Sequence, residues 1–366
     1  MKAMVQETYG SPDVVHLRDV DKPVVGDDEV LVRVRAASVN PPDWVGVTGV
    51  PYVARLTYGL RRPRNGVRGS DVAGTVAAVG KNVTRLRIGD EIFGVGVGTF
   101  AEYAVAPEEH LVPKPANITF EQAAAVPMSG LTALQALRDV GKVQPGQKVL
   151  IVGAGGGIGT FAVQIARSLG AEVTGVCSTT KVDLVRSLGA DHVIDYTQAD
   201  FTEGAERYDL VFDNVLDHSL SRLVRALKPK GMLVPNGGQF YKRGFASMGV
   251  MFIKAPLLSL VVSQRVRHFL EAPKQEDLLA LKELLESGKV TPVVDRTYPL
   301  SQAAEAIRYF GEGHARGKVA ITVGESDAAA QETRRRAGAG RTLLGERSGR
   351  RWDNGSRSGA GRTLSL

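Results

Sequence analysis

A glycine-rich stretch in the middle of the chain, residues 153–159, has the composition of a phosphate-binding turn. Glycine adopts the backbone angles of a tight turn, and without a side chain it lets a pyrophosphate reach backbone N–H groups. Residues 149–152 before it form an apolar run typical of a buried parallel strand, and apolar residues recur after it at helical spacing. A strand, a glycine turn and a helix in this order predict dinucleotide binding, although a glycine-rich stretch can also be a plain turn. The predicted cofactor contacts here are Gly153, Gly155, Gly156, Gly157, Ile158 and Gly159.

The end of the next predicted strand, residues 177–181, indicates which nucleotide would bind. NAD sites usually carry an Asp or Glu there for the ribose 2′-hydroxyl, whereas NADP sites carry polar and basic groups. This strand end reads Cys-Ser-Thr-Thr-Lys and has no carboxylate, which favours NADPH. Ser178 would donate a hydrogen bond to the 2′-phosphate, and Lys181 would supply charge. The alternative is that Ser178 caps a helix and Lys181 is a solvated side chain.

Residues 149–238 alternate between strand-like and helix-like segments, which predicts a parallel sheet covered by helices. Ligands bind to such sheets at the carboxyl ends of the strands. We therefore expect further residues at predicted strand ends to lie near the cofactor, namely Tyr196, Asn214, Asn236 and Gly237.

The length of 366 residues and the hydrophobic content of 43% predict two or three domains with sizeable cores. Residues 1–125 read as short strands separated by Gly, Pro and Asp, which is typical of a small barrel-like domain, and no helical pattern persists before position 120. More than half of the net charge of +7 lies in residues 325–366, a Gly-, Arg- and Ser-rich segment that we expect to be disordered. The basic excess therefore does not predict a nucleic-acid surface on the rest of the chain.

Cys177 is the single cysteine of the chain, which excludes an internal disulfide and a multi-cysteine zinc site. The first residues lack the apolar core of a signal peptide, which favours a cytoplasmic protein. Residues 239–270 are apolar with scattered basic residues, and we expect one or two helices that cover the cleft, form a subunit contact or lie on a membrane surface. Lys254 and Pro256 interrupt the most apolar part, so a membrane-spanning helix is not expected.

The motifs of residues 1–324, taken together in their order, resemble the medium-chain dehydrogenase/reductase superfamily, in particular its zinc-independent, quinone-oxidoreductase-like (zeta-crystallin-like) branch. The resemblance implies an α/β fold, in which a doubly wound Rossmann sheet and a chaperonin-10-like (GroES-like) β-barrel catalytic domain hold the cofactor between them. It implies domains at residues 1–125 and 126–270, a return to the catalytic domain at 271–324, and a homodimer. The motifs are NPPDW, GSDVAGTVAAVG, GDEIFG, SGLTALQAL, VLIVGAGGGIG, SLGADHVIDY and GHARGKVAITV.

The zinc enzymes of this superfamily place a cysteine in an early loop and a His-Glu pair after a glycine. Here residues 40–43 read Asn-Pro-Pro-Asp, and residues 69–71 read Gly-Ser-Asp. Oxygen ligands alone suit zinc poorly, so no catalytic metal is expected. Without a Lewis acid an alkoxide is hard to stabilise, whereas the anion formed by hydride addition to a quinone or an α,β-unsaturated carbonyl needs less stabilisation. The resemblance therefore implies an NADPH-dependent reductase of such substrates.

The resemblance also implies roles for residues around the nicotinamide. Asn40 would lie near the nicotinamide and the substrate, Thr132 would contact the nicotinamide end, and Tyr52 would donate to the substrate oxygen. Tyr196 resembles a tyrosine that meets the 2′-phosphate. Each has a structural alternative. Asn40 would be a turn residue, Thr132 a helix-interior hydroxyl and Tyr52 a packed loop side chain, whereas Tyr196 would be a strand-end aromatic. No residue is an obvious general acid. Two other functions stay open: a zinc-independent alcohol dehydrogenase or enoyl reductase, and a protein that binds NADPH without turnover.

Overall fold

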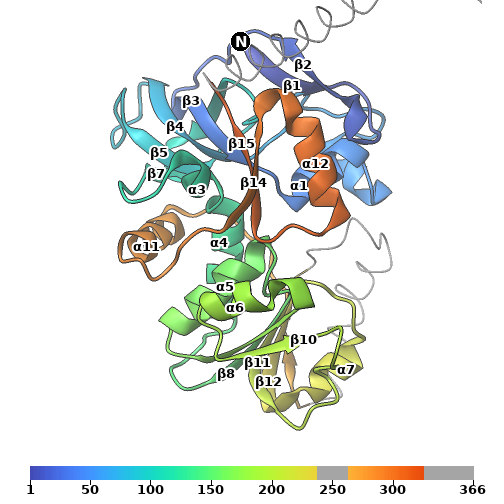
Figure 1. Cartoon of the computed structure of the whole chain (residues 1–366). Helices are drawn as coiled ribbons and strands as arrows, with labels where there is room; N and C mark the ends of the chain where they lie inside the picture. Colours follow the sequence, from blue (N-terminus) through green and yellow to red (C-terminus); the bar gives the residue numbers. More distant parts are fainter. Residues whose placement is uncertain (237–262, 325–366) are drawn as a thin grey trace, which may run out of the picture. The chain divides into compact units, whose positions relative to one another are not determined.

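The structure is a computed structural model that describes residues 1–236 and 263–324. These residues belong to one compact unit, Met1–Gly324, and form two lobes (Figure 1). The first lobe is built on a seven-stranded sheet of the described residues and the second on a six-stranded one. Three parts of the chain about which the sequence makes predictions lie outside the described residues. They are Gly237, most of the apolar segment 239–270 and the basic segment 325–366.

The first lobe is organised around β3 (Glu29–Ser38), most of whose residues are buried. β3 pairs antiparallel with β4 (Asp71–Val79), β6 (Tyr103–Pro107) and β15 (Lys318–Thr322), so segments far apart in the sequence meet along it. The other strands of this lobe are β5 (Glu91–Val95), β7 (Leu111–Pro113) and β14 (Val294–Pro299), and the separate pair β1 (Lys2–Gln6) and β2 (Val15–Asp19).

Helices begin earlier in this lobe than the sequence pattern indicates. α1 (Pro41–Thr48) and α2 (Arg55–Tyr58) lie within the stretch expected to be β-rich without helices. α1 starts there because the Asp43 carboxylate accepts the backbone N–H of Asn40 at 2.8 Å, and because prolines at the first helical positions forgo N–H groups that would have no partner. The other helices outside the second lobe are α3 (Phe120–Ala124), α4 (Pro127–Leu134), α11 (Gln275–Glu286) and α12 (Ala303–Glu312), with a π-helical turn at Gln135–Val140.

The second lobe is a parallel sheet in which β8 (Lys148–Val152) lies between β9 (Glu172–Cys177) and β11 (Tyr208–Asp213). The spatial order β10-β9-β8-β11-β12-β13 reverses its direction at β8, which is the strand order of doubly wound dinucleotide-binding sheets. The predicted α/β fold class is thereby confirmed. The remaining elements of this lobe are β10 (His192–Asp195), β12 (Leu227–Pro235), β13 (Arg265–Val266), α5 (Gly157–Ser168), α6 (Val182–Ser187) and α7 (Leu220–Arg225).

β13 differs from the sequence expectation, because helices are expected over residues 239–270. Met232 of β12 pairs with Arg265, so this short strand extends the sheet in parallel. The open edge of β12 offers unpaired backbone N–H and C=O groups, and pairing with that edge outweighs the local apolar pattern. The expectation of a helix is therefore wrong for the described end of the segment.

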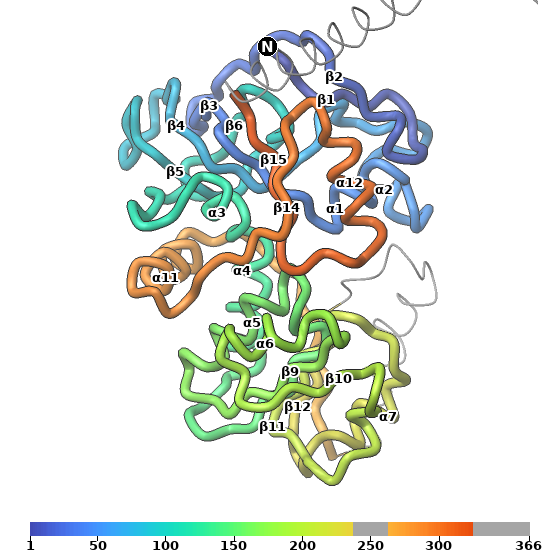
Figure 2. The backbone as a smooth tube through the Cα atoms, in the orientation of Figure 1, coloured from blue at the N-terminus to red at the C-terminus, as the bar shows by residue number. Residues whose placement is uncertain are grey.

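The two lobes meet at α4 and α5, which pack against each other at the junction (Figure 2). Leu131 and Leu134 of α4 and Phe161 and Ile165 of α5 are buried in one hydrophobic cluster, together with residues of β8 and β9. Burial of each such side chain contributes about 2 kcal/mol, so the junction is a packed core. The start of α5, where the glycine turn lies, is thereby held against the first lobe.

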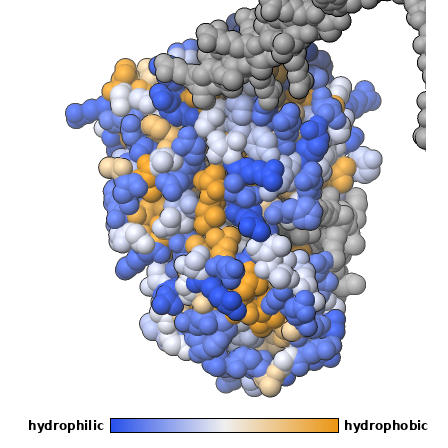
Figure 3. Space-filling model, viewed as in Figure 1, coloured by the Kyte–Doolittle hydropathy of each residue, from blue (hydrophilic) through white to orange (hydrophobic). Residues whose placement is uncertain are grey.

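The surface of the described residues carries scattered apolar side chains. On the face seen in Figure 3, hydrophobic residues form small groups among hydrophilic ones. Val24, Ile88 and Leu279 are examples of exposed large apolar residues on separate elements and loops. Within residues 1–236 and 263–324, no helix has the length and apolar character needed to cross a membrane.

The stability of the junction depends on a buried carboxylate of α11. Asp277 is fully buried and accepts hydrogen bonds from Gln135 and Arg138 of the π-helical turn. We predict that Asp277→Ala lowers the free energy of unfolding by about 2 kcal/mol, because Gln135 and Arg138 lose their contacts with the buried carboxylate. The loss is limited because Gln135 still donates to the Ala272 carbonyl oxygen and Arg138 still pairs with Asp139. Urea unfolding measures this. The control Asp183→Ala removes an exposed carboxylate that lies 3.7 Å from Arg186 and should cost less than about 0.5 kcal/mol; equal losses in the two variants would contradict the prediction.

Candidate functional site

A cavity of about 380 Å³ lies between the carboxyl ends of the parallel strands and the first lobe, which contributes residues 39–41 and several residues between 310 and 319. The residues singled out from the sequence that line it are Asn40, Gly153, Gly155, Gly156, Gly157, Ile158, Gly159, Ser178, Lys181, Tyr196 and Asn214. Those that the structure places outside its lining are Tyr52, Thr132 and Asn236. Lining residues that sequence reasoning missed include Ser129, Phe201, Asp217, His218, Phe310 and Lys318.

The glycine turn lies at the switch point of the sheet, directly after β8. Gly153 has a φ of +79°, which favours glycine, and a Cβ on Gly159 would lie 2.1 Å from the Gly153 carbonyl oxygen. α5 begins after Gly156, and no side-chain cap is present at this helix start in the described structure. The first N–H groups of α5, at the positive end of its dipole, can therefore receive an anion such as a pyrophosphate.

Backbone contacts join the glycine turn to the first lobe. The Gly317 N–H donates to the Gly155 carbonyl oxygen at 3.2 Å, and Gly156 and Gly317 form an isolated parallel bridge. Lys181 crosses the same boundary, because its Nζ donates to the Ala315 carbonyl oxygen at 2.6 Å. Residues 315–317 of the first lobe therefore form one wall of the cavity beside the turn.

Ser178, Lys181 and Tyr196 gather at the ends of β9 and β10, where a 2′-phosphate is expected. Ser178 occupies the N-cap position of the 3-10 turn Thr179–Lys181, as the capping alternative has it, but its hydroxyl makes no cap hydrogen bond. Lys181 is partly buried, and a Cβ on Gly155 would lie 2.8 Å from its Cδ. Burial lowers the pKa of Lys181, while the nearby Asp295 carboxylate opposes that shift. A partly desolvated lysine beside a hydroxyl is well suited to bind an anion.

Two asparagines lie at the carboxyl ends of β11 and β12. Asn214 lines the cavity, and its Nδ2 donates to the Val152 carbonyl oxygen at 3.3 Å. Asn236 donates from Nδ2 to the Asn214 Oδ1 at 3.0 Å. In this arrangement Asn236 acts on the site through Asn214 and does not line the cavity itself.

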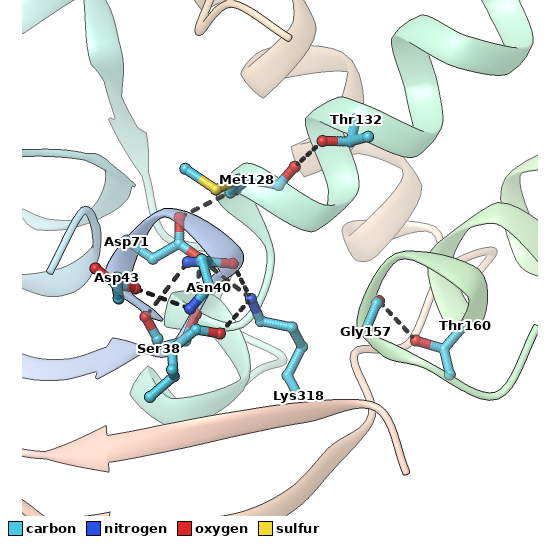
Figure 4. Close-up of polar contacts among 10 residues, drawn as sticks. Ser38, Asn40, Asp43, Asp71, Met128, Thr132, Gly157, Thr160 and Lys318 are labelled. Atoms are coloured by element: carbon cyan, nitrogen blue, oxygen red, sulfur yellow. Dashed lines mark hydrogen bonds and ion pairs between the residues drawn. The ribbon is translucent and has the colours of Figure 1, made fainter. Parts of the chain in front are cut away.

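A buried polar cluster surrounds Asn40 where the first lobe meets the cavity (Figure 4). The Asn40 Oδ1 accepts a hydrogen bond from Lys318 Nζ at 2.5 Å. The Asn40 Nδ2 donates to Asp71 Oδ2 at 2.8 Å and to the Ser38 carbonyl oxygen at the longer distance of 3.3 Å. Asn40 therefore borders the cavity with both ends of its amide bound by neighbouring residues.

Asp71 connects this cluster to the helix that carries Thr132. Its Oδ2 accepts a hydrogen bond from the Ser38 hydroxyl at 2.7 Å, and its Oδ1 accepts the Met128 N–H of the first turn of α4 at 3.0 Å. Lys318 Nζ lies 3.4 Å from Asp71 Oδ2. Burial lowers the pKa of Lys318, and the Asp71 carboxylate opposes that shift. The carboxylate thus holds β3, β4 and α4 in one arrangement around Asn40.

Lys318 could not be assigned to this site from the sequence. It begins an apolar run, where a lysine is usually a solvated strand end, although it lies within the last motif of the resemblance, GHARGKVAITV. β15 runs antiparallel to β3, and this pairing brings Lys318 to Asn40 across 278 residues of chain. The motif was the available signal in the sequence, but only the pairing of β15 with β3 shows that Lys318 lies at Asn40.

Thr132 and Tyr52 are placed away from the cavity lining. Thr132 is buried in α4, and its Oγ1 donates to the Met128 carbonyl oxygen at 2.7 Å, as the helix-interior alternative describes. Tyr52 is 67% exposed, and the Arg55 guanidinium lies 4.7 Å from its ring centre. The roles of both residues near the nicotinamide stay predictions.

The described part of the chain contains no group of three or more His, Cys, Asp or Glu side chains able to hold a metal ion. The positions that correspond to zinc ligands in the resemblance carry Asn40, Ser70 and Asp71. Their amide, hydroxyl and carboxylate are a poor donor set for zinc. The Lys318 ammonium, 2.5 Å from Asn40 and 3.4 Å from Asp71, adds a positive charge that repels a cation. These residues therefore do not fit a catalytic zinc.

A doubly wound sheet with a glycine turn at its switch point, together with a cavity shared with a mostly antiparallel lobe, defines a two-lobed nucleotide-binding protein of the dehydrogenase type. Residues 26–116 match the family model of the alcohol dehydrogenase GroES-like domain, and residues 188–321 match that of the zinc-binding dehydrogenases. The chain belongs to the medium-chain dehydrogenase/reductase superfamily, in its quinone-oxidoreductase-like branch.

Known relatives cover most of this chain. The 2-methylene-furan-3-one reductase of Solanum lycopersicum and the chloroplastic NADPH-dependent alkenal/one oxidoreductase of Arabidopsis thaliana are each 33% identical, over 88% of this chain and 79% of their own. The mitochondrial NAD(P)H oxidoreductase RTN4IP1 of Mus musculus is 33% identical, over 88% and 89%. The solved quinone oxidoreductase of Coxiella burnetii is 30% identical, with a TM-score of 0.77 over 88% of this chain and 99% of that one. These matches confirm the family and the fold class expected from the motifs.

Asp43 is a buried carboxyl group at the base of the Asn40 cluster. It accepts the backbone N–H groups of Asn40 at 2.8 Å and of Gly69 at 3.2 Å. Burial raises the pKa of Asp43 to about 7, with Asp71 adding to the shift and Lys318 opposing it. The folded protein therefore retains a proton here that an unfolded chain releases near the ordinary pKa of 3.8.

This raised pKa predicts a pH dependence of stability. As the pH rises from about 4 to about 7, the unfolded chain gains from ionising Asp43 while the folded protein does not, so stability is lost over that range. We expect the free energy of unfolding of Asp43→Asn to rise by about 2 kcal/mol relative to that of the wild type between about pH 5 and about pH 7. Urea unfolding at both pH values measures this difference, with exposed Asp183→Asn as control. If the difference in the free energy of unfolding between Asp43→Asn and the wild type did not change with pH, the raised pKa of Asp43 would be disproved.

Proposed function

We propose that this chain is a zinc-independent, NADPH-dependent oxidoreductase that transfers a hydride to a quinone or an α,β-unsaturated carbonyl compound. The observation that carries the proposal is one cavity that joins Ser178 and Lys181, at the end of β9, to Asn40 in the first lobe. At the end of β9, Ser178 supplies a hydroxyl and Lys181 a cation for a 2′-phosphate. At the other end of the cavity, the polar cluster around Asn40 is a poor set of zinc ligands. The names of the relatives, which include an alkenal/one oxidoreductase and a quinone oxidoreductase, support this substrate class.

The residues along the cavity fit NADPH. The N–H groups of the glycine turn would hold the pyrophosphate, since the turn is free of side chains that would block its approach. Ser178, Lys181 and Tyr196 would hold the 2′-phosphate by hydrogen bonds and charge. Asn214, supported by Asn236, would complete the cofactor site. Gly237, a further cofactor contact predicted from the sequence, lies outside the described residues. A mycobacterial protein solved in complex with NADPH, 27% identical with a TM-score of 0.76, supports this choice of cofactor.

At the other end of the cavity the residues of the first lobe would position the reaction. When bound, NADPH supplies the hydride that reduces the substrate. Asn40 and Thr132 would orient the nicotinamide end, and Tyr52 would donate a hydrogen bond to the substrate oxygen. Hydride addition leaves negative charge on that oxygen, and fixed hydrogen-bond donors stabilise the resulting enolate or hydroquinone anion. Water supplies the proton that completes the reduction in this proposal.

Further parts of the proposal concern the whole chain. They are the division at residues 1–125, 126–270, 271–324 and 325–366, a homodimeric state and a cytoplasmic location. The pairing of β14 and β15 within the sheet of β3 supports the return of the chain to the first lobe. Light scattering after size-exclusion chromatography tests the homodimer, for which a monomer mass is the opposing result.

The preference for NADPH over NADH tests the assignment at the end of β9. We expect Lys181→Ala to lower the ratio of kcat/KM for NADPH to that for NADH by about 10- to 100-fold, because a charge-assisted contact to the 2′-phosphate is lost. Ser178→Ala should lower the ratio by about 5-fold. Lys289→Ala, which removes an exposed lysine of the loop after α11, should leave the ratio unchanged. We use the ratio of the two kcat/KM values because loss of the Lys181 contact with the Ala315 carbonyl oxygen would affect NADPH and NADH alike and would cancel.

The same assay tests the reaction class. Oxidation of NADPH is followed by its absorbance with a panel of quinones, enones and simple ketones, with and without a chelator. Turnover of quinones or enones that prefers NADPH and ignores the chelator supports the proposal. Loss of activity with the chelator would contradict the zinc-independent assignment, and NADPH binding without turnover would favour a non-catalytic binding protein. Turnover confined to simple ketones or alcohols would favour an alcohol dehydrogenase.

A further inference from the structure

Lys318 has a buried ammonium group for which the proposed reaction so far gives no role. The residue is 3% exposed, and Nζ has three acceptors within hydrogen-bond distance: the Asn40 Oδ1 at 2.5 Å, the Val39 carbonyl oxygen at 3.4 Å and the Asp71 Oδ2 at 3.4 Å. A buried ammonium is costly unless it is paired and hydrogen-bonded. The short bond to Asn40 and the opposite charge of Asp71 therefore explain how the charge is kept in this place.

The side chain of Lys318 runs between the cofactor turn and Asn40. Its backbone follows Gly317, which bridges to Gly156 of the glycine turn. A Cβ on Gly157 would lie 3.1 Å from Lys318 Cδ, so the lysine stem passes directly beside the turn. Figure 4 shows its ammonium end pointing toward Asn40 and Asp71. Lys318 is therefore in contact with both halves of the proposed site.

The bond from Lys318 settles which end of the Asn40 amide can donate. An ammonium has only donors, so the amide oxygen must face it and the Nδ2 group must face away. One Nδ2 hydrogen is bound to Asp71 at 2.8 Å, whereas the other makes the long contact of 3.3 Å with the Ser38 carbonyl oxygen. A cation on the amide oxygen withdraws electrons from the nitrogen and strengthens its N–H groups as donors.

We propose that Lys318 is a positioning residue of the reaction, which orients the Asn40 amide and strengthens its weakly held Nδ2 hydrogen as a donor to the substrate oxygen. The inference rests on the proposed function, in which that oxygen gains negative charge after hydride addition. Through Asn40, the ammonium supplies positive polarisation at the substrate oxygen. The proton and the hydride of the reaction come from water and from NADPH as before, so Lys318 keeps its proton.

A mutant cycle with Asn40 tests this role in the full-length protein. Lys318→Met keeps the length of the stem and removes the ammonium, and we expect kcat to fall by about 10- to 100-fold while KM for NADPH changes by less than about 3-fold. Lys318→Arg keeps a positive donor but adds bulk in a buried site, so it should restore part of the loss, to a kcat at least about 3-fold above that of Lys318→Met. In the Asn40→Ala background, Lys318→Met should lower kcat by less than about 2-fold, because the two residues act as one unit. Equal losses in both backgrounds would show a merely structural lysine and overturn the inference.

The side-chain amide of Asn40 gives a second readout that does not depend on activity. Its NMR resonance is assigned by its disappearance in Asn40→Ala. We expect this resonance to shift in Lys318→Met and to stay near the wild-type position in Lys318→Arg, and an unshifted resonance in Lys318→Met would overturn the inference. If Lys318→Met does not fold, Lys318→Gln replaces it, because it keeps a neutral donor and should give a smaller shift and a smaller loss of kcat. Absence of turnover by the wild type with every quinone and enone would refute the proposed function, and the resonance alone then decides the role of Lys318.

Discussion

The hydrogen bonds of the buried Lys318 ammonium are the interaction on which the first-lobe side of the site depends. They join the start of β15 to Asn40, after β3, and to Asp71, at the start of β4. Asp71 in turn receives the first turn of α4 through the Met128 N–H. Four segments that are distant in sequence are thus fixed around one charge. Removing the ammonium would leave the Asn40 Oδ1 without its donor and Asp71 without its opposite charge, so we expect Lys318, Asn40 and Asp71 to act as a unit.

The cofactor side of the site depends on a different constraint, the absence of side chains at the glycine positions of the turn. Gly153 and Gly159 allow the chain to turn tightly enough for α5 to start at the switch point of the sheet. Gly317 of the first lobe donates a backbone hydrogen bond to Gly155 of the same turn. The turn therefore serves both as an anion site and as the contact between the lobes. The packed pair α4 and α5 keeps that contact in place.

Local signals in the sequence were sufficient for the cofactor half of the fold. The apolar strand, the glycines and the amphipathic helix are adjacent in the chain, so β8, the turn and α5 could be predicted. Long-range pairing set the rest: Lys318 meets Asn40 across 278 residues, and the strand β13 forms because the edge of β12 is open. α1 was not predicted because its two prolines read as a loop. Resemblance suggested Tyr52 and Thr132 by their positions along the chain, but such a match does not show where a side chain points.

The proposed NADPH site is tested most directly by a crystal structure of the protein in complex with NADPH. We expect the 2′-phosphate within hydrogen-bond distance of Ser178 and Lys181, the pyrophosphate at the N–H groups of the glycine turn, and the nicotinamide beside Asn40. A 2′-phosphate that touches neither Ser178 nor Lys181, or a nicotinamide placed at the Phe201 side of the cavity, would contradict it.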